Sequence, residues 1–194
     1  MKKLKIIAAL AAAIFISALL LFDFHISVSS TAQNISMTRI SGGNGSAEQK
    51  ERIPFLTSPL RIVSDDPKLS QSLARQISQI PGFDQVEVLN AIPEDTHQPV
   101  LIVRQTASER LWLVFFAKSA INVEMIFASD GQWDSNHIEM QDGQPGVVRL
   151  TEKMDLADRS VGIMSRPWYF RHLREEITKQ VINALKNDLE QPVD

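Results

Sequence analysis

The pattern of apolar and polar positions divides the chain into an apolar start, a polar stretch and a longer region of regular alternation. Residues 6–22 are apolar except for Ser17, with three lysines before them and Asp23 directly after. As a helix, these roughly 17 residues would cover about 25 Å, slightly less than a hydrocarbon core of about 30 Å. Lysines before an apolar stretch predict a cytoplasmic N-terminus, which places the rest of the chain on the far side of the membrane.

The apolar start has two interpretations, a retained single-pass anchor and a cleaved signal peptide. A signal peptide has a basic start, an apolar stretch of about 7–15 residues and small residues at its cleavage site. Ser30-Thr31-Ala32 could serve as that site and would leave Gln33 as the new N-terminus. The apolar stretch is somewhat long for this, and the site lies well beyond its end. We therefore favour an anchor within residues 1–26 and keep release after Ala32 as the alternative.

Residues 27–56 form the polar stretch. They are rich in Ser, Gly, Asn and Gln and show no apolar period. Such a composition is typical of flexible linkers. We therefore predict a flexible tether here, followed by one extracytoplasmic domain at residues 57–190 and a short C-terminal tail at 191–194.

The domain is predicted to begin with a strand, a helix and a second strand. The two strands are expected at residues 60–63 and 85–89; in the second, Val86 and Val88 alternate with Gln85 and Glu87. Between them, Asp66 followed by Pro67 is typical of a helix start, and apolar residues recur every third or fourth position up to Pro81-Gly82. Strand, helix and strand within this length predict a parallel crossover unit.

Three further strands are predicted at 100–104, 111–118 and 121–128, with tight reversals between them. This pattern indicates an antiparallel meander. The segment 111–118, LWLVFFAK, is apolar on both faces, and a strand with two apolar faces belongs in the middle of a sheet. We therefore place it centrally.

The last third of the domain alternates and then changes to a helical period. Strands are predicted at 147–156 and 161–165, with a turn at 157–160 between them. Residues 168–189 carry apolar side chains at a 3.6-residue period and predict a long amphipathic helix. The fold class expected from these elements is α+β, with a mixed or antiparallel sheet of five to seven strands and two amphipathic helices packed on one face.

Composition excludes several classes of function. The 194 residues carry a net charge of −3, so the chain has no general basic field to attract nucleic acid. Cysteine is absent, which excludes disulfides, thiolate zinc sites, cysteine nucleophiles and a lipid anchor on cysteine. The Gly-x-Ser-x-Gly nucleophile elbow and glycine-rich phosphate loops are absent as well. We therefore assign no catalytic residue and predict no cofactor.

Two clusters come nearest to metal-ligand or acid–base spacing. His137 and Glu139 would share one face of a strand, and Glu94, Asp95 and His97 share a loop. Ordinary solvated loop and strand residues explain both clusters better than a metal site does, so no metal is predicted and His97, His137 and Glu139 are only weak candidates. The alternative function is a carboxylate- or metal-dependent enzyme that uses those loop residues or the acidic pair Asp65 and Asp66.

Arginine and aromatic residues gather at the start of the final helix. Side chains of these two kinds are frequent anchors of binding surfaces. The predicted partner-binding residues are Arg166, Trp168, Tyr169, Arg171 and Arg174, together with Trp133 on a predicted turn. The function expected from the sequence is a membrane-tethered extracytoplasmic domain that binds or scaffolds another envelope or membrane protein, as an accessory subunit of a membrane complex. A secreted ligand-binding domain released after Ala32 is the second alternative.

Overall fold

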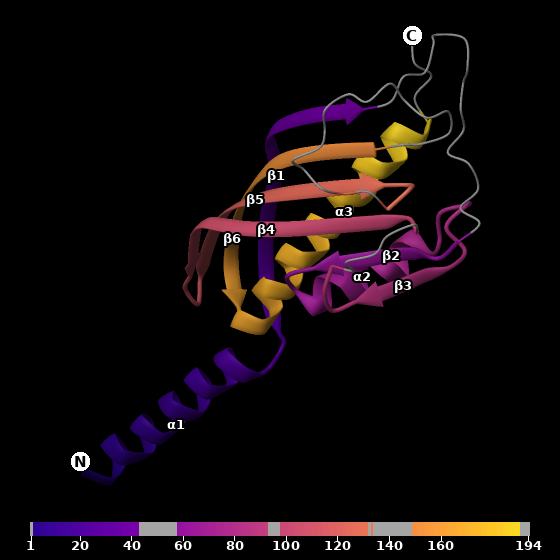
Figure 1. Ribbon diagram of the computed structural model, residues 1–194. Coiled ribbons are helices and arrows are strands. Elements are labelled where there is room, and N and C mark those ends of the chain that lie inside the picture. The colour runs from indigo at the N-terminus through magenta and orange to yellow at the C-terminus, as the bar shows by residue number, and fades with distance from the viewer. Residues whose placement is uncertain (1, 43–57, 93–97, 132, 134–148, 191–194) are drawn as a thin grey trace.

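The computed structural model describes residues 2–42, 58–92, 98–131, 133 and 149–190, which form three helices and one six-stranded sheet. In chain order the elements are α1 (Lys2–Leu21), β1 (His25–Gly42), β2 (Leu60–Ser64), α2 (Pro67–Ile77), β3 (Val86–Leu89), β4 (Val100–Trp112), β5 (Phe116–Ala128), β6 (Arg149–Met164) and α3 (Arg166–Glu190) (Figure 1). The α+β class predicted from the sequence is confirmed.

The sheet is mixed, with strand order β1-β6-β5-β4-β2-β3. Strands β1, β6, β5 and β4 pair antiparallel, whereas β2 runs parallel to both β4 and β3. The unit β2-α2-β3 is therefore the parallel crossover expected from the sequence. Its helix begins as predicted, because the Asp66 carboxylate accepts a hydrogen bond from the Lys68 N–H and Pro67 occupies the first turn.

The main core lies between the sheet and the pair α2 and α3, which contact each other behind the sheet (Figure 1). Apolar side chains from both helices and the facing side of the sheet form one buried cluster, which includes Leu60, Leu73, Leu101, Met125, Met154 and Ile177. The opposite face of the sheet is divided. A smaller apolar cluster covers its β2–β4 side, and an ion-pair ladder of Arg104, Glu124 and Lys153 crosses β4, β5 and β6.

Helix α1 extends away from the domain, joined to it only near its C-terminal end (Figure 1). There Leu19 is buried and α1 contacts α3. The large apolar residues of α1 are otherwise exposed on every side; they include Ile6, Leu10, Ile14, Phe15 and Leu21. Within the described residues, no helix has both the length and the hydropathy required to span a bilayer.

The prediction of a flexible tether is wrong for residues 27–42, because they belong to β1. This strand pairs antiparallel with β6 from His25 opposite Met164 to Gly42 opposite Arg149. The physical reason lies in its composition: residues 27–41 contain neither glycine nor proline, and β-branched residues recur along them. Polar side chains are acceptable because β1 is an edge strand. The remainder of the predicted tether, from residue 43, lies outside the described residues.

The prediction of a central strand at 111–118 is also wrong, because this segment is a hairpin. Strand β4 ends at Trp112, β5 begins at Phe116, and the predicted reversals near 108–110 and 118–120 lie within the two strands. Pairing between β4 and β5 runs from Trp112 opposite Ala117 back to Val100 opposite Ala128, and it needs the reversal at residues 113–115. The apolar stretch thus forms a turn in place of a buried strand.

The predicted turn at 157–160 is wrong as well. Strand β6 continues through these residues, which pair with β1 on one side and with β5 on the other. Two ladders of backbone hydrogen bonds hold the strand extended where the local sequence alone indicated a break. This continuation gives β6 enough length to reach the start of α3.

Candidate functional site

The start of α3 is fixed to the short connection between α1 and β1. The Phe24 N–H donates to the Ser165 Oγ, and the Ser165 N–H donates to the Phe24 carbonyl, both at 3.0 Å. Ser165 also caps α3, since its Oγ accepts a hydrogen bond from the Trp168 N–H at 3.3 Å. An ion pair of 2.6 Å between Asp23 and Arg171 adds a third contact. Residues 22–24 therefore form an ordered connection.

A stack of three rings lies next to this connection. The Trp168 indole lies between two imidazoles, with its centroid 4.7 Å from that of His25 and 5.3 Å from that of His172. Because Trp168 is half-buried, it exposes part of its ring while it joins β1 to α3. Of the predicted partner-binding residues, Arg166, Trp168 and Arg171 lie together at this end of the domain.

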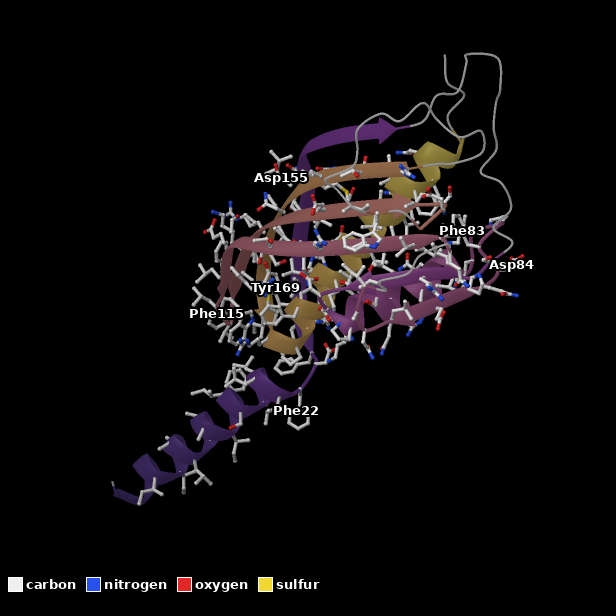
Figure 2. The ribbon with its side chains drawn as sticks, in the orientation of Figure 1. Phe22, Phe83, Asp84, Phe115, Asp155 and Tyr169 are labelled. Atoms are coloured by element: carbon white, nitrogen blue, oxygen red, sulfur yellow. The ribbon has the colours of Figure 1, made fainter. Side chains whose placement is uncertain are left out.

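Tyr169 has to be removed from the predicted contact surface. It is fully buried in the main core, and its hydroxyl donates a hydrogen bond of 3.0 Å to the Ser119 Oγ on β5. Burial raises the pKa of the phenol, which remains neutral. Tyr169 follows the aromatic pattern of its neighbours in sequence, but the helical rotation turns it toward the sheet (Figure 2).

Arg174 and Trp133 do not join the group at the start of α3. Arg174 is half-buried and approaches the Asp66 carboxylate at 3.7 Å, so it holds α3 against the start of α2. Trp133 packs against the smaller apolar cluster on the opposite face of the sheet. The six predicted residues therefore belong to four separate environments, and only three of them share an accessible surface.

Sequence reasoning missed two arginines at this end of the domain, of which Arg110 extends this surface. The Arg110 guanidinium lies over the Phe170 ring at 5.2 Å, and Arg166 lies over the same ring at 5.4 Å. Arg159 lies over the Phe116 ring at 5.5 Å. Arg110 is on β4 and contacts Phe170, so sheet pairing brings it to the start of α3 from a distant part of the sequence. Arg159 follows Asp158 on β6, so its side chain lies on the opposite face of the sheet, where it is exposed. No local motif could have indicated this.

A partly buried polar cluster lies beside the ring stack. His172 Nε2 lies 2.7 Å from the Ser30 Oγ and 3.1 Å from the Asp158 Oδ1. The Ser30 hydroxyl donates to the Asp158 Oδ1 at 2.9 Å, and the Ser160 hydroxyl lies within 3.1 Å of both Ser30 and Asp158. These residues come from β1, β6 and α3. Sequence reasoning missed them because it placed Ser30 in a tether and Asp158 in a turn.

This cluster contains serine, histidine and aspartate, but its geometry differs from that of a catalytic triad. In a triad the aspartate binds one imidazole nitrogen and the serine binds the other, which accepts the serine proton. Here a single nitrogen, Nε2, faces both Asp158 and Ser30. Nε2 must carry a proton to bind the carboxylate, so it cannot also accept one from Ser30. The arrangement therefore joins three elements and does not activate a nucleophile.

Within this cluster, His172 and Asp158 form an ion pair at pH values between the pKa of the aspartate and that of the histidine. The hydrogen bond to Asp158 raises the pKa of His172, although burial of the imidazole opposes this effect. Burial alone would raise the pKa of Asp158, but its hydrogen bonds to His172 and Ser30 outweigh burial and lower it. A raised pKa for the histidine and a lowered pKa for the aspartate are expected when two partners stabilise each other's charged forms.

The acidic pair proposed for an enzyme has structural roles. Asp66 caps α2, and Asp65 accepts hydrogen bonds from the Gln105 N–H at 3.0 Å and the Ser64 hydroxyl at 3.3 Å. The other candidates for catalysis or metal binding lie outside the described residues; they are Glu94, Asp95, His97, His137 and Glu139. Among the residues that are described, no group of three or more His, Asp or Glu could hold a metal ion.

A small pocket opens beside the polar cluster, between α3 and the sheet. Its lining includes Asp158, Leu156, Leu173 and Glu176. Its volume is about 10 Å³, far below the range of roughly 300–1,000 Å³ usual for small-molecule sites. Comparison with known proteins gives no further guide to its use, because no family model matches the chain and no curated protein is similar to it.

Proposed function

We propose that this protein is a membrane-tethered extracytoplasmic domain that binds or scaffolds another envelope or membrane protein, as an accessory subunit of a membrane complex. The observation that supports a membrane tether is the exposure of the large apolar side chains of α1 from Ile6 to Leu21, all but Leu19. A helix that is apolar on every side needs an apolar environment. Because its apolar run is slightly shorter than a hydrocarbon core, a crossing requires local thinning of the bilayer.

The orientation follows from charge. Three lysines lie at the start of α1 and Asp23 follows its end, so the positive-inside rule favours a cytoplasmic N-terminus. Retention of α1 is favoured over release, since cleavage after Ala32 would cut β1 between residues paired with β6. It would also separate Ser30 from its partners Asp158 and His172.

The partner is expected at the start of α3. Arg166 and Arg171 are exposed there beside the half-buried Trp168, and these residue types are frequent at the centres of protein interfaces. The ordered connection at residues 22–24 would hold this surface close to the membrane, which suits a partner that is itself embedded in or bound to the membrane.

Membrane tethering and orientation are tested first. We expect the full chain to stay in the membrane fraction after alkaline extraction. We also expect a reporter fused after Asp194 to be active outside the cytoplasm. Activity of the reporter only in the cytosol would refute the proposed location and the class of partner inferred from it.

The partner surface is tested by charge reversal on α3. In the native membrane, Arg166→Glu is expected to abolish co-purification of the partner, whereas Lys186→Glu, an exposed cation near the other end of α3, should leave it intact. Equal membrane content and equal melting temperature for both variants would show that folding is unaffected. Retention of the partner by Arg166→Glu would refute this surface.

A further inference from the structure

The end of the domain from which α1 departs carries an unusual concentration of exposed apolar side chains. Outside α1, the large apolar residues exposed at this end are Phe22, Ile26, Leu111, Leu113, Phe115 and Val161. Figure 2 shows Phe22 and Phe115 at this end of the molecule. Backbone pairing explains the grouping, because the Phe115 carbonyl accepts from the Gly162 N–H at 3.1 Å and Phe116 pairs with Val161.

The turn between β4 and β5 has an amino-acid composition that is unusual for a hairpin turn. Two-residue hairpin turns favour Gly, Asn or Asp, which adopt positive φ and tolerate water. Here Val114 and Phe115 form the turn between Leu113 and Phe116, closed by a hydrogen bond of 2.7 Å from the Leu113 N–H to the Phe116 carbonyl. Phe115 is 65% exposed. A turn with this composition is suited to an apolar environment, and departures of this kind are expected at functional positions.

The charges around the apolar turn are predominantly positive. Among the described residues near it, Asp23 and Glu175 both form ion pairs with Arg171, and Glu109 forms one with Lys118. Arg110 and Arg159 lie over aromatic rings, and within the described part of the chain neither has a carboxylate partner. This end is therefore cationic, although the whole chain carries a net charge of −3. Apolar side chains flanked by arginine are typical of surfaces that enter an anionic bilayer interface.

The connection to α1 fixes the position of the turn relative to the helix. Hydrogen bonds between Phe24 and Ser165 hold residues 22–24 against α3, and Leu19 is buried where α1 contacts α3. The apolar run of α1 covers about 25 Å of a hydrocarbon core of about 30 Å. The exposed apolar side chains at the end of the domain next to α1 would extend this apolar surface beyond the end of the helix.

From these observations we infer that the turn at Leu113–Phe115 enters the bilayer interface next to α1, with Arg110 and Arg159 at the level of anionic lipid headgroups. This inference rests on the proposed membrane tether and adds a second contact with the bilayer. The domain would then have one fixed orientation on the membrane, with the start of α3 beside the lipid surface.

The absence of cysteine allows a direct test with single labelled positions in the full chain. Phe115→Cys, Ile14→Cys and Asp84→Cys would each carry an environment-sensitive fluorophore after reconstitution into vesicles. The vesicles would contain phosphatidylcholine alone or an equimolar mixture with phosphatidylglycerol, each with a nitroxide-labelled lipid as quencher. Ile14 reports on the anchor, Phe115 on the turn, and Asp84 on an exposed loop at the opposite end of the domain (Figure 2).

We expect the probes at Ile14 and Phe115 to lose most of their emission to the lipid quencher, with that at Asp84 unaffected. The loss at Phe115 should be larger in the anionic vesicles, and Arg110→Gln with Arg159→Gln should remove that difference. Quenching at Ile14 but not at Phe115 would overturn this inference and leave the tether intact. Quenching at Phe115 but not at Ile14 would support the turn and refute the anchor.

Two other outcomes would also overturn the inference. A probe at Phe115 shielded from both aqueous iodide and the lipid quencher would show that a protein surface, such as a second copy of the chain, covers the turn. Equal quenching at Phe115 in the two kinds of vesicle would refute the role assigned to the arginines.

Discussion

Adjacent residues at the start of α3 have opposite surroundings. Trp168 is half-buried between two imidazoles, whereas Tyr169 is fully buried and bound to Ser119. Both residues belong to one aromatic run in the sequence, where side-chain type alone cannot separate a contact residue from a core residue. A step of about 100° along the helix separates them in space. Contact residues are therefore better chosen by helical face than by clustering in sequence.

The core role of Tyr169 is testable by removal of its hydroxyl. Tyr169→Phe retains the ring but leaves the buried Ser119 hydroxyl without this partner, so we expect a loss of about 1–2 kcal/mol in the free energy of unfolding. Urea unfolding of the protein in detergent would measure it. Binding of the membrane partner should be unchanged. A variant with full stability but weaker binding would return Tyr169 to the contact surface.

The ion pair of His172 and Asp158 predicts a pH dependence of stability. The pKa of His172 is raised in the folded state, so its contribution is complete below the unfolded value of about 6.5 and is lost as the pH rises through the folded pKa. The pKa of Asp158 is lowered, so its contribution is present above about 3.9 and is lost as the pH falls through the folded pKa. The pair therefore stabilises the fold most between about pH 4 and pH 6.5.

Melting temperatures measured within and above this pH range would test the contribution of the pair to stability. We expect the wild-type protein to lose stability as the pH rises above about 6.5, and His172→Gln to lose much less over the same interval. His25→Gln is the matched control, because His25 stacks on the same indole but is not among the side chains that bind Asp158. Parallel profiles for the wild type and His172→Gln would contradict the assignment.

At the scale of elements, β1 depends on a close approach to β6 at Gly162. Its φ of 137° lies in a region that side chains rarely adopt, and an added Cβ would lie 2.6 Å from the Ser27 carbonyl oxygen and 2.7 Å from the Val28 Cα. Ser27 itself has a φ of 50°, at an irregularity in the pairing of β1 with β6. The backbone of β1 thus occupies the space of a missing side chain.

Substitutions at these two positions should have opposite effects. Gly162→Ala forces the backbone apart and adds strain at positive φ, so we expect a loss of about 2–4 kcal/mol. Ser27→Gly relieves a strained φ and should be neutral or stabilise by up to about 1 kcal/mol. Chemical unfolding of both variants would measure the difference. An unchanged stability for Gly162→Ala would mean that β1 does not approach β6 in this way.

Some elements of the fold could be predicted from the sequence and others could not, depending on whether their signals are local. Helices α2 and α3 and the parallel unit β2-α2-β3 were predicted, because their caps and apolar periods are local signals. Strand β1 was missed, since an edge strand of Ser, Thr and Asn resembles a linker until its partner is known. The hairpin at residues 113–115 was missed because apolar residues usually indicate burial. At the candidate site, Arg166, Trp168 and Arg171 were found from one run, whereas Arg110, Arg159, Ser30 and Asp158 depend on strand pairing.

At the scale of the whole molecule, α1 and the domain are joined by ordered residues in place of a long tether. The connection from Phe22 to Phe24 is held by Ser165 and by the ion pair of Asp23 with Arg171. A domain fixed in this way cannot sample a wide volume around α1. Under the proposed membrane tether, partners are expected close to the membrane surface, on the side where α3 contacts α1.

This arrangement makes a specific prediction about where the chain can be shortened. A chain that starts at Phe22 keeps all of β1 and the contacts of Phe24, Asp23 and Ser30, whereas one that starts at Gln33 loses the strand pairs from His25 to Ala32. We expect the shorter chain to be less stable by about 3–5 kcal/mol, or roughly 10–15 °C in melting temperature. Calorimetry of the two soluble chains would measure this difference. Equal melting temperatures would mean that residues 25–32 add nothing to the fold, and release after Ala32 would then leave an intact domain. A large difference would argue against release after Ala32, because that cleavage removes the first part of the strand that completes the sheet.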